Sequence, residues 1–210
     1  MSRLTLVIGD KNLSSWSLRP WLAMKQAGIA FEERKILLDR PETKAEIKKY
    51  SPSGRVPCLI DGDIAIWDSL AICEYLAEKF PEKHLWPIDP KARAVARSVS
   101  AEMHSGFQNL RNLWPMNFSR EGMRHLTYGI DDDIRRIADI WENARREHGV
   151  GGPFLFGGFS IADAMYAPVV SRFATYGPVN LPSRAQEWFA MMRALPAMRE
   201  WGEGAQAEIA

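Results

Sequence analysis

The sequence predicts a small domain of mixed α/β structure followed by an all-helical domain. Over about the first 80 residues, short β-rich runs alternate with helical patterns. A proline-rich stretch without periodicity, FPEKHLWPIDP, then interrupts the chain. After it, apolar residues recur at every third or fourth position, as on one face of a helix. These observations predict domains at 1–80 and 92–210, joined by a linker at 81–91.

The first part of the α/β domain predicts a strand, a helix, a strand and a helix. The apolar run LTLVI at 4–8 predicts the first strand, and the helical pattern after a serine-rich loop ends at Gly28. Residues 31–38 predict a second strand and residues 41–50 a polar helix.

The second part predicts a hairpin and a helix. Asp61-Gly62 is a hairpin signal between strands expected at 58–60 and 64–67. Apolar residues at helical spacing follow over 69–80. The resulting order, βαβαββα, is the thioredoxin-like arrangement of a mixed sheet with helices packed on it.

Three helical patterns are clear in the second domain. The first runs over 95–114 and is ended by Pro115, and the second covers 134–141. The third begins at Ser160, which together with Asp163 matches a capping box, so Asp163 is expected to be structural. The tryptophans in these patterns are expected in the core or at an interface: Trp114, Trp141, Trp188 and Trp201.

Composition argues against several classes of protein. Lys and Arg number 27 against 26 Asp and Glu, so no basic excess is present to bind a nucleic acid backbone. No apolar run is long enough to predict a membrane span or a signal peptide, so we expect a cytoplasmic protein. Cys58 and Cys73 stand alone, which disfavours a disulfide framework, a dithiol redox site and a metal site. We expect Cys73 to be a buried packing residue.

The segment Arg55-Val56-Pro57 comes just before the strand expected at 58–60. A proline there belongs at a strand entrance, and its peptide bond is a candidate for the cis form. The bend leaves the backbone of Val56 free to pair with an extended peptide ligand. The alternative is an ordinary turn proline.

Two helix starts could also bind a ligand. Asp68-Ser69 begins the helix at 69–80, where Ser69 can cap and the free N–H groups favour a carboxylate. The loop before the first helix holds serines at 14, 15 and 17, more than a single cap requires. Capping alone would explain either feature.

Together these segments resemble the cytosolic glutathione S-transferases, and most closely the zeta class and its bacterial relatives. SSWSLRPWL is similar to the SSCSxRVR motif of that class, GRVPCLIDGD to its Val-Pro strand and hairpin, and DSLAICEYL to the helix that follows. GGFSIADAMYAP is similar to the capped helix of the helical domain. The resemblance covers about residues 4–200.

The resemblance implies a glutathione site in the first domain and a substrate pocket facing the helical one. Ser14 would hydrogen-bond the glutathione sulfur and favour its thiolate, with Ser15 assisting. Val56 would pair with the cysteinyl backbone before cis-Pro57. The γ-glutamyl end would be held by two residues, Asp68 and Ser69.

Two residues depart from the zeta pattern. Trp16 stands where the motif has cysteine, which places a bulky ring near the substrate and puts the isomerase activity of the class in doubt. Arg55 replaces the usual Gln or Lys and adds a cation that could meet a carboxylate of glutathione or of an acidic substrate.

One face of the helix expected over 95–114 is a candidate wall of the substrate pocket. His104, Phe107, Gln108 and Arg111 lie on one side at intervals of three or four residues, on a helix that lines the pocket in the family. The alternative is that Phe107 belongs to the core while His104 and Arg111 are solvated or bond neighbouring helices.

We therefore expect a transferase that ionises bound glutathione and conjugates it to small hydrophobic or acidic electrophiles. A glutathione-dependent cis-trans isomerase of the maleylacetoacetate type and a non-catalytic glutathione-binding stress protein are the alternatives. A dithiol oxidoreductase is a poor fourth, because the loop before the first helix has serines and no cysteine. The resemblance also implies a homodimer.

Overall fold

A mixed four-stranded sheet forms the centre of the N-terminal half. The computed structural model describes residues 3–120, 122 and 129–209. The strands are β1 (Thr5–Ile8), β2 (Glu32–Lys35), β3 (Cys58–Asp61) and β4 (Ile64–Trp67), in the spatial order β2-β1-β3-β4. β1 pairs with β2 in parallel, and the other two pairs are antiparallel.

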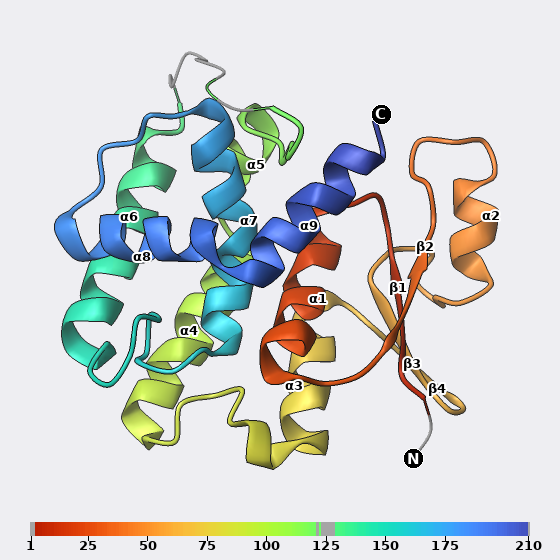
Figure 1. The fold of residues 1–210 in the computed structure, drawn as a ribbon, viewed down its shortest axis with the longest axis horizontal. Coiled ribbons are helices and arrows are strands. Elements are labelled where there is room, and N and C mark those ends of the chain that lie inside the picture. The colour runs from red at the N-terminus through yellow and green to blue at the C-terminus, as the bar shows by residue number, and fades with distance from the viewer. Residues whose placement is uncertain (1–2, 121, 123–128, 210) are drawn as a thin grey trace.

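Helices cover both faces of this sheet. α1 (Ser15–Ala27) and α3 (Ser69–Lys79) lie between the sheet and the helical half, whereas α2 (Thr43–Lys48) lies on the opposite face (Figure 1). The chain therefore follows the expected order βαβαββα.

The C-terminal half contains no strand among its described residues. After the short 3-10 helix η1 (Pro81–Lys83), its helices are α4 (Pro90–Ser105), α5 (Gln108–Leu113), α6 (Asp131–His148), α7 (Ile161–Tyr176), α8 (Ser183–Ala194) and α9 (Pro196–Ala207). α4 begins within the segment expected to be a linker, because Asp89 caps it and a proline at the first helical position is well tolerated.

α7 is the central helix of the molecule, and almost all of its residues are buried. It packs against α1 of the N-terminal half as well as against α4 and α8. Its start is the expected capping box, in which the Asp163 side chain accepts from the backbone N–H of Ser160 at 2.9 Å. The same carboxylate accepts from Leu155 N and Trp188 Nε1, so Asp163 has a structural role, as predicted.

The aromatic core agrees with the prediction. All four tryptophans that were assigned to core or interface positions are at most 1% exposed: Trp114, Trp141, Trp188 and Trp201. Trp141 lies 4.5 Å from Trp188 between ring centroids, and Trp114 stacks on Tyr176 at 5.4 Å. Cys73 is also buried, as expected.

The expectation of one continuous helix over 95–114 is wrong. α4 ends at Ser105, Gly106 is extended, and Phe107 adopts a left-handed conformation with φ of 59° before α5 begins. A Cβ on Gly106 would lie 2.8 Å from the carbonyl oxygen of Glu102, so the close approach at this break requires glycine. The apolar spacing in the sequence continues across the break, because α5 also buries an apolar residue, Leu110. The pattern therefore does not reveal where α4 ends.

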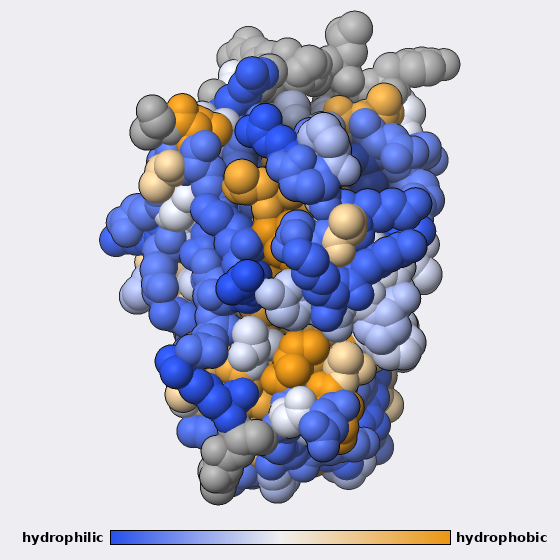
Figure 2. Space-filling view, turned by 90° about the vertical axis from the view of Figure 1, so that its right-hand side faces the viewer, coloured by the Kyte–Doolittle hydropathy of each residue, from blue (hydrophilic) through white to orange (hydrophobic). Residues whose placement is uncertain are grey.

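The side of the molecule on which α2 lies, the right-hand side of Figure 1, is largely hydrophilic, with a few apolar areas near its middle (Figure 2). Exposed apolar side chains of the N-terminal half include Leu37, Ile64 and Trp67. Among the described helices, none is both long and apolar enough to cross a membrane.

Candidate functional site

A cavity of about 570 Å³ opens where α1, α3 and the Val56-Pro57 bend meet α4. Its lining comes from both halves of the chain and comprises Trp16, Ser53, Arg55, Val56, Pro57, Trp67, Asp68, Ser69 and His104. Seven of these nine residues are among those singled out from the sequence.

The Val56–Pro57 peptide bond is cis, as predicted. The registered pairs of β1 and β3 end at Val7 and Cys58, so Val56 lies beyond the ladder. Val56 lines the cavity at the entrance of a strand, where backbone groups outside the ladder can pair with an extended chain.

Asp68, rather than Ser69, caps α3. Its Oδ1 accepts from Leu70 N at 2.9 Å and from Ala71 N at 3.2 Å, and its φ is 75°. The expectation that Ser69 caps is wrong, because the left-handed turn at Asp68 places Ser69 at the first helical position. Ser69 Oγ is buried and has no hydrogen-bond partner within the structure described here. A hydroxyl at a helix N-terminus that lines a cavity is suited to bind a carboxylate.

The serines of the first loop are organised by their own hydrogen bonds. Ser14 caps α1: its Oγ accepts from Ser17 N at 3.3 Å and donates to Ser17 Oγ at 2.7 Å. Ser17 Oγ also accepts from Gly9 N, which ties the loop to the end of β1. Ser14 is 5% exposed and Ser15 7%, and neither lines the cavity, whereas the next residue, Trp16, does.

Trp16 forms a wall of the cavity and is held by cations. The guanidinium carbons of Arg19 and Arg111 lie 4.2 and 4.8 Å from the centre of its ring. The His104 ring meets it edge-on at 5.3 Å. Cation–π contacts at these distances fix the position of the ring.

His104, near the end of α4, is the residue that the helical half contributes to the lining of the cavity. Its Nε2 lies 3.1 Å from Asp68 Oδ2, so one carboxylate bridges the start of α3 and the end of α4. Desolvation lowers the pKa of His104 from its ordinary value, with Arg19 and Arg111 acting in the same direction and Asp68 opposing them.

The other three residues of the predicted pocket face do not line this cavity. Phe107 is a core residue at the break between α4 and α5, and the Gln108 amide donates to the carbonyl of Ser105 at 3.1 Å. Arg111 donates to the carbonyl of Gly106 at 2.9 Å and lies against Trp16. The break after Ser105 changes the direction of the chain, which removes the common face that a continuous helix would have given.

Comparisons with known proteins show the family to which the chain belongs. The glutathione S-transferase N-terminal domain model matches residues 13–79, and the C-terminal domain model matches residues 102–201. Maleylacetoacetate isomerase of Rattus norvegicus is 43% identical over 164 residues, which cover 75% of this chain and 72% of the rat protein. The chain belongs to the glutathione S-transferase family.

Other relatives match this chain over different shares of their length. Glutathione S-transferase Z1 of Arabidopsis thaliana is 38% identical over 174 residues, 80% of this chain and 74% of the plant protein. The match to Glutathione S-transferase 1 of Dianthus caryophyllus is 40% identical and spans only half of that protein, 50% of its length.

Solved structures of transferases share the fold. A glutathione transferase homolog from Burkholderia GL BGR1, solved with bound glutathione, superposes with a TM-score of 0.72 at 23% identity over 98% of this chain and 99% of that one. Glutathione S-transferase unclassified 2 from Bombyx mori gives 0.78 at 22% identity, over 98% and 95%. The predicted class, a thioredoxin-like domain followed by a helical one, is confirmed.

Two residues of the cavity were not singled out from the sequence. Ser53 precedes the Val56 bend by three residues, and Trp67 ends β4 with its side chain 46% exposed. The sequence offered no signal for either residue. The exposure of Trp67 is a property of the folded chain, and a tryptophan at the end of a β-rich run is explained by the strand. A serine in an SPSG turn is explained by the turn alone.

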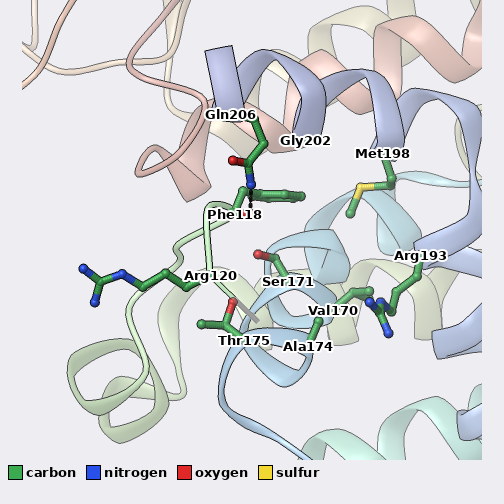
Figure 3. A pocket seen from close by; sticks show the side chains of 10 residues that line it. All are labelled: Phe118, Arg120, Val170, Ser171, Ala174, Thr175, Arg193, Met198, Gly202 and Gln206. Atoms are coloured by element: carbon green, nitrogen blue, oxygen red, sulfur yellow. Dashed lines mark hydrogen bonds between the residues drawn. The ribbon is translucent and has the colours of Figure 1, made fainter. Parts of the chain in front are cut away.

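A second cavity, of about 200 Å³, lies elsewhere in the helical half (Figure 3). It is enclosed by α7, α9 and the segment around Phe118, whose carbonyl accepts from Gln206 Nε2 at 3.3 Å. Phe118 and Met198 contribute apolar surface, and Arg120 points away from the centre (Figure 3). The sheet contributes nothing to its lining, so it is separate from the cavity at Val56. Within the described residues, no cluster of His, Cys, Asp and Glu suited to a metal ion is found in either place.

Proposed function

We propose that the protein binds glutathione in the cavity at Val56, ionises its thiol and conjugates it to small electrophiles. The observation that carries this proposal is the Val56 edge before cis-Pro57 facing the start of α3 across one cavity. A peptide-pairing edge and a carboxylate-binding helix start are the two features that an acidic tripeptide requires.

Each end of glutathione has a complementary group. Val56 pairs with the cysteinyl backbone, and Arg55 beside it offers a cation to a glutathione carboxylate. Ser69 Oγ, which has no partner in the described structure, donates to the γ-glutamyl carboxylate at the start of α3. Asp68 receives the γ-glutamyl ammonium.

The thiol must be ionised for the reaction to proceed. A free thiol with a pKa of about 8.5 is only a few per cent thiolate at pH 7, and a shift of about 2 units requires roughly 2.7 kcal/mol. A hydrogen bond to a charged group contributes about 1.5 to 3 kcal/mol, and a helix N-terminus about 0.3 to 1. We assign this hydrogen bond to Ser14, which does not itself line the cavity but precedes the cavity residue Trp16 by two positions; its hydroxyl would turn from Ser17 Oγ to the sulfur, with Ser15 assisting.

The thiolate is then the nucleophile. It attacks the electrophilic carbon of the second substrate, the new C–S bond forms, and the leaving group departs with its electron pair, while the thiol proton has gone to solvent. The protein aims the sulfur and stabilises its charge, and no side chain forms a covalent bond. In this proposal the second substrate lies against Trp16 and His104, which line the cavity where it meets the helical half.

The test is the rate of glutathione addition to 1-chloro-2,4-dinitrobenzene at pH 6.5. Replacing Ser14 by alanine should lower kcat/KM about 10- to 100-fold, the loss of one hydrogen bond to an anion. Ser98→Ala is the control, because the Ser98 hydroxyl donates to the Ala94 carbonyl on the outside of α4. Equal rates in the wild type, Ser14→Ala and Ser15→Ala would remove both serines from the mechanism.

A glutathione-dependent isomerase is the second candidate, favoured by the identity shared with the rat maleylacetoacetate isomerase. In such a reaction the thiolate adds, the bond rotates and the thiolate leaves. The Trp16 ring, fixed by two guanidinium groups, occupies the position of the motif cysteine and opposes it. Isomerisation of a maleyl diketo acid would establish this candidate, and glutathione binding without turnover of either kind would favour a non-catalytic binding protein.

The same proposal includes a cytoplasmic, detoxifying homodimer, supported by membership of the family. The substrates would be small hydrophobic or acidic electrophiles. Light scattering on the purified protein tests the dimer, which predicts twice the chain mass of 23.8 kDa. The division into domains at 81–91 stays a prediction.

A further inference from the structure

Three arginine side chains converge behind the wall of the cavity. Arg19 on α1 is 0% exposed and Arg172 on α7 is 3% exposed, and Arg111 on α5 is partly buried beside them. Arg19 Nε donates to the carbonyl of Met165, and Arg172 Nε to that of Trp114. These carbonyls fix the positions of the side chains but leave the positive charges uncompensated.

Several guanidinium nitrogens of this cluster have no partner. Arg19 Nη1 and Nη2 and Arg172 Nη1 are buried and make no hydrogen bond in the described structure. Burial, together with repulsion from Arg111 and Arg172, lowers the pKa of Arg19. Arginine remains protonated in proteins, and buried charges are normally paired with an opposite charge. The cluster is therefore a source of positive potential directed at any anion nearby.

The acidic groups around the cluster offset only part of its charge: Asp68 attracts Arg19 and Asp133 attracts Arg111, but both carboxylates are also engaged elsewhere. Asp68 is shared by the start of α3 and His104, and Asp133 Oδ2 accepts from Leu110 N. Burial raises the pKa of Cys73 to about 12 and also raises that of Tyr166, so both stay neutral at physiological pH.

Arg19 and Arg111 lie against the Trp16 ring, and Arg172 is near enough to both to repel their charges. Trp16 follows the two serines proposed to meet the glutathione sulfur. We propose that Arg19, Arg111 and Arg172 act as electrostatic positioning residues that stabilise the thiolate of bound glutathione across Trp16. The thiol proton leaves to solvent, and the cations remain in place without contacting the sulfur. Because Arg19 and Arg172 are buried, their field is weakly screened.

This inference rests on the proposed glutathione site and adds a source of thiolate stabilisation beyond the serine hydroxyls. Ser14 donates its single proton to Ser17 Oγ in the described structure, and the cluster acts in addition to the hydrogen bond that Ser14 gives the sulfur once its hydroxyl turns. By linkage, an anion that the cluster stabilises must in turn stabilise the folded protein. Glutathione, which can ionise, should therefore raise the Tm more than S-methylglutathione, which cannot.

The test uses Arg172, which lies on α7 outside the cavity lining. The thiolate absorbance of glutathione bound to the full chain is recorded from pH 5 to 9 in the wild type, Arg172→Met and Arg172→Lys. We expect the thiol pKa to rise by about one unit in Arg172→Met and to stay near the wild-type value in Arg172→Lys, which keeps the charge. Affinity for S-methylglutathione should be the same in all three, since that ligand has no thiol to ionise.

Two controls separate charge from folding. Arg146→Met removes an exposed arginine of α6 that pairs with Glu147, and it should leave the thiol pKa unchanged. If Arg172→Met does not fold, Arg111→Met is measured against Arg111→Lys in the same way. A thiol pKa that is low in the wild type and equally low in the folded Met variants would overturn the inference while leaving the glutathione site intact. No thiolate band in the wild type at any pH would instead contradict the proposed function.

Discussion

Two buried serines have hydroxyl groups without a partner in the described structure, and they differ only in their surroundings. Ser69 lines the cavity at the start of α3, whereas Ser100 lies within α4 and lines no part of it. A hydroxyl left unpaired at a cavity wall is available to a ligand, while one left unpaired within a helix packing surface is not.

Replacing Ser69 by alanine should therefore weaken glutathione binding with little effect on folding. The loss of one hydrogen bond to a carboxylate predicts a Kd about 10- to 100-fold higher by calorimetry. Ser100→Ala is the matched control and should bind as the wild type does. Equal affinities in the two variants would remove Ser69 from the site.

At the residue scale the sequence predicted the cavity well where a motif fixes the backbone. The places of Pro57 and Asp68 at the cavity could be predicted, because a proline at a strand entrance and an acidic residue at a helix start have few alternative conformations. The cap itself was misassigned to Ser69, since the positive φ of Asp68 shifts the helix start by one residue. The orientation of Arg111 could not be predicted from the sequence, because it depends on the helix break at Gly106.

At the element scale, the break between α4 and α5 positions His104 at the cavity and turns Arg111 behind Trp16. Gly106→Ala should lower the free energy of unfolding by about 1 to 3 kcal/mol, because its Cβ would meet the Glu102 carbonyl at 2.8 Å. Denaturant midpoints measure this loss. Gly158→Ala is the control, since a Cβ there has no neighbour within 4 Å, and equal midpoints would contradict the account.

The start of α7 makes stability depend on pH. Burial raises the pKa of Asp163 to about 6, above the value of about 3.9 in an unfolded chain. The folded protein therefore binds this proton more readily, so the stabilisation from Asp163 is complete below pH about 4 and is lost as pH rises through about 6.

This loss amounts to roughly 3 kcal/mol, since each pKa unit corresponds to about 1.4 kcal/mol. Relative to Asp163→Asn, whose side chain does not titrate, the wild type should lose that much unfolding free energy between pH 4 and 7. The two stabilities are compared by urea titration at each pH, and parallel pH profiles would show that Asp163 does not titrate in this range.

The elements themselves were predictable because each has local signals. The capping box at Ser160 and the hairpin at Asp61-Gly62 lie within a few residues of chain and fix their own geometry. The helix break at Gly106 was not predicted, because glycine within an apolar helical pattern is compatible with a continuous helix.

At the scale of the whole molecule, the C-terminus holds the loop that carries the serines. Glu208 Oε1 accepts from Lys11 N at 2.9 Å and Oε2 from Asn12 N at 3.1 Å, and Lys35 Nζ lies 3.1 Å from Oε1. The Glu208 side chain is only 6% exposed. These bonds join the two ends of the sequence, so the position of Ser14 depends on the last residues of the chain.

Glu208→Ala should lower the free energy of unfolding by about 1.5 to 3 kcal/mol and raise KM for glutathione, because two partly buried N–H groups of the loop lose their charged acceptor. Glu203→Ala, at an exposed position of α9, is the control. Unchanged KM in a Glu208→Ala protein of lowered stability would show that the loop holds its geometry without this clamp. Such a contact between residues nearly 200 positions apart has no signature in a single sequence.

The most direct test of the account is the ionisation state of bound glutathione. Calorimetry with glutathione, combined with the ultraviolet thiolate band from pH 5 to 9, measures both binding and the thiol pKa. The account predicts binding with a thiol pKa about 2 units below that of the free thiol. Binding of the neutral thiol alone, or no binding, would contradict it.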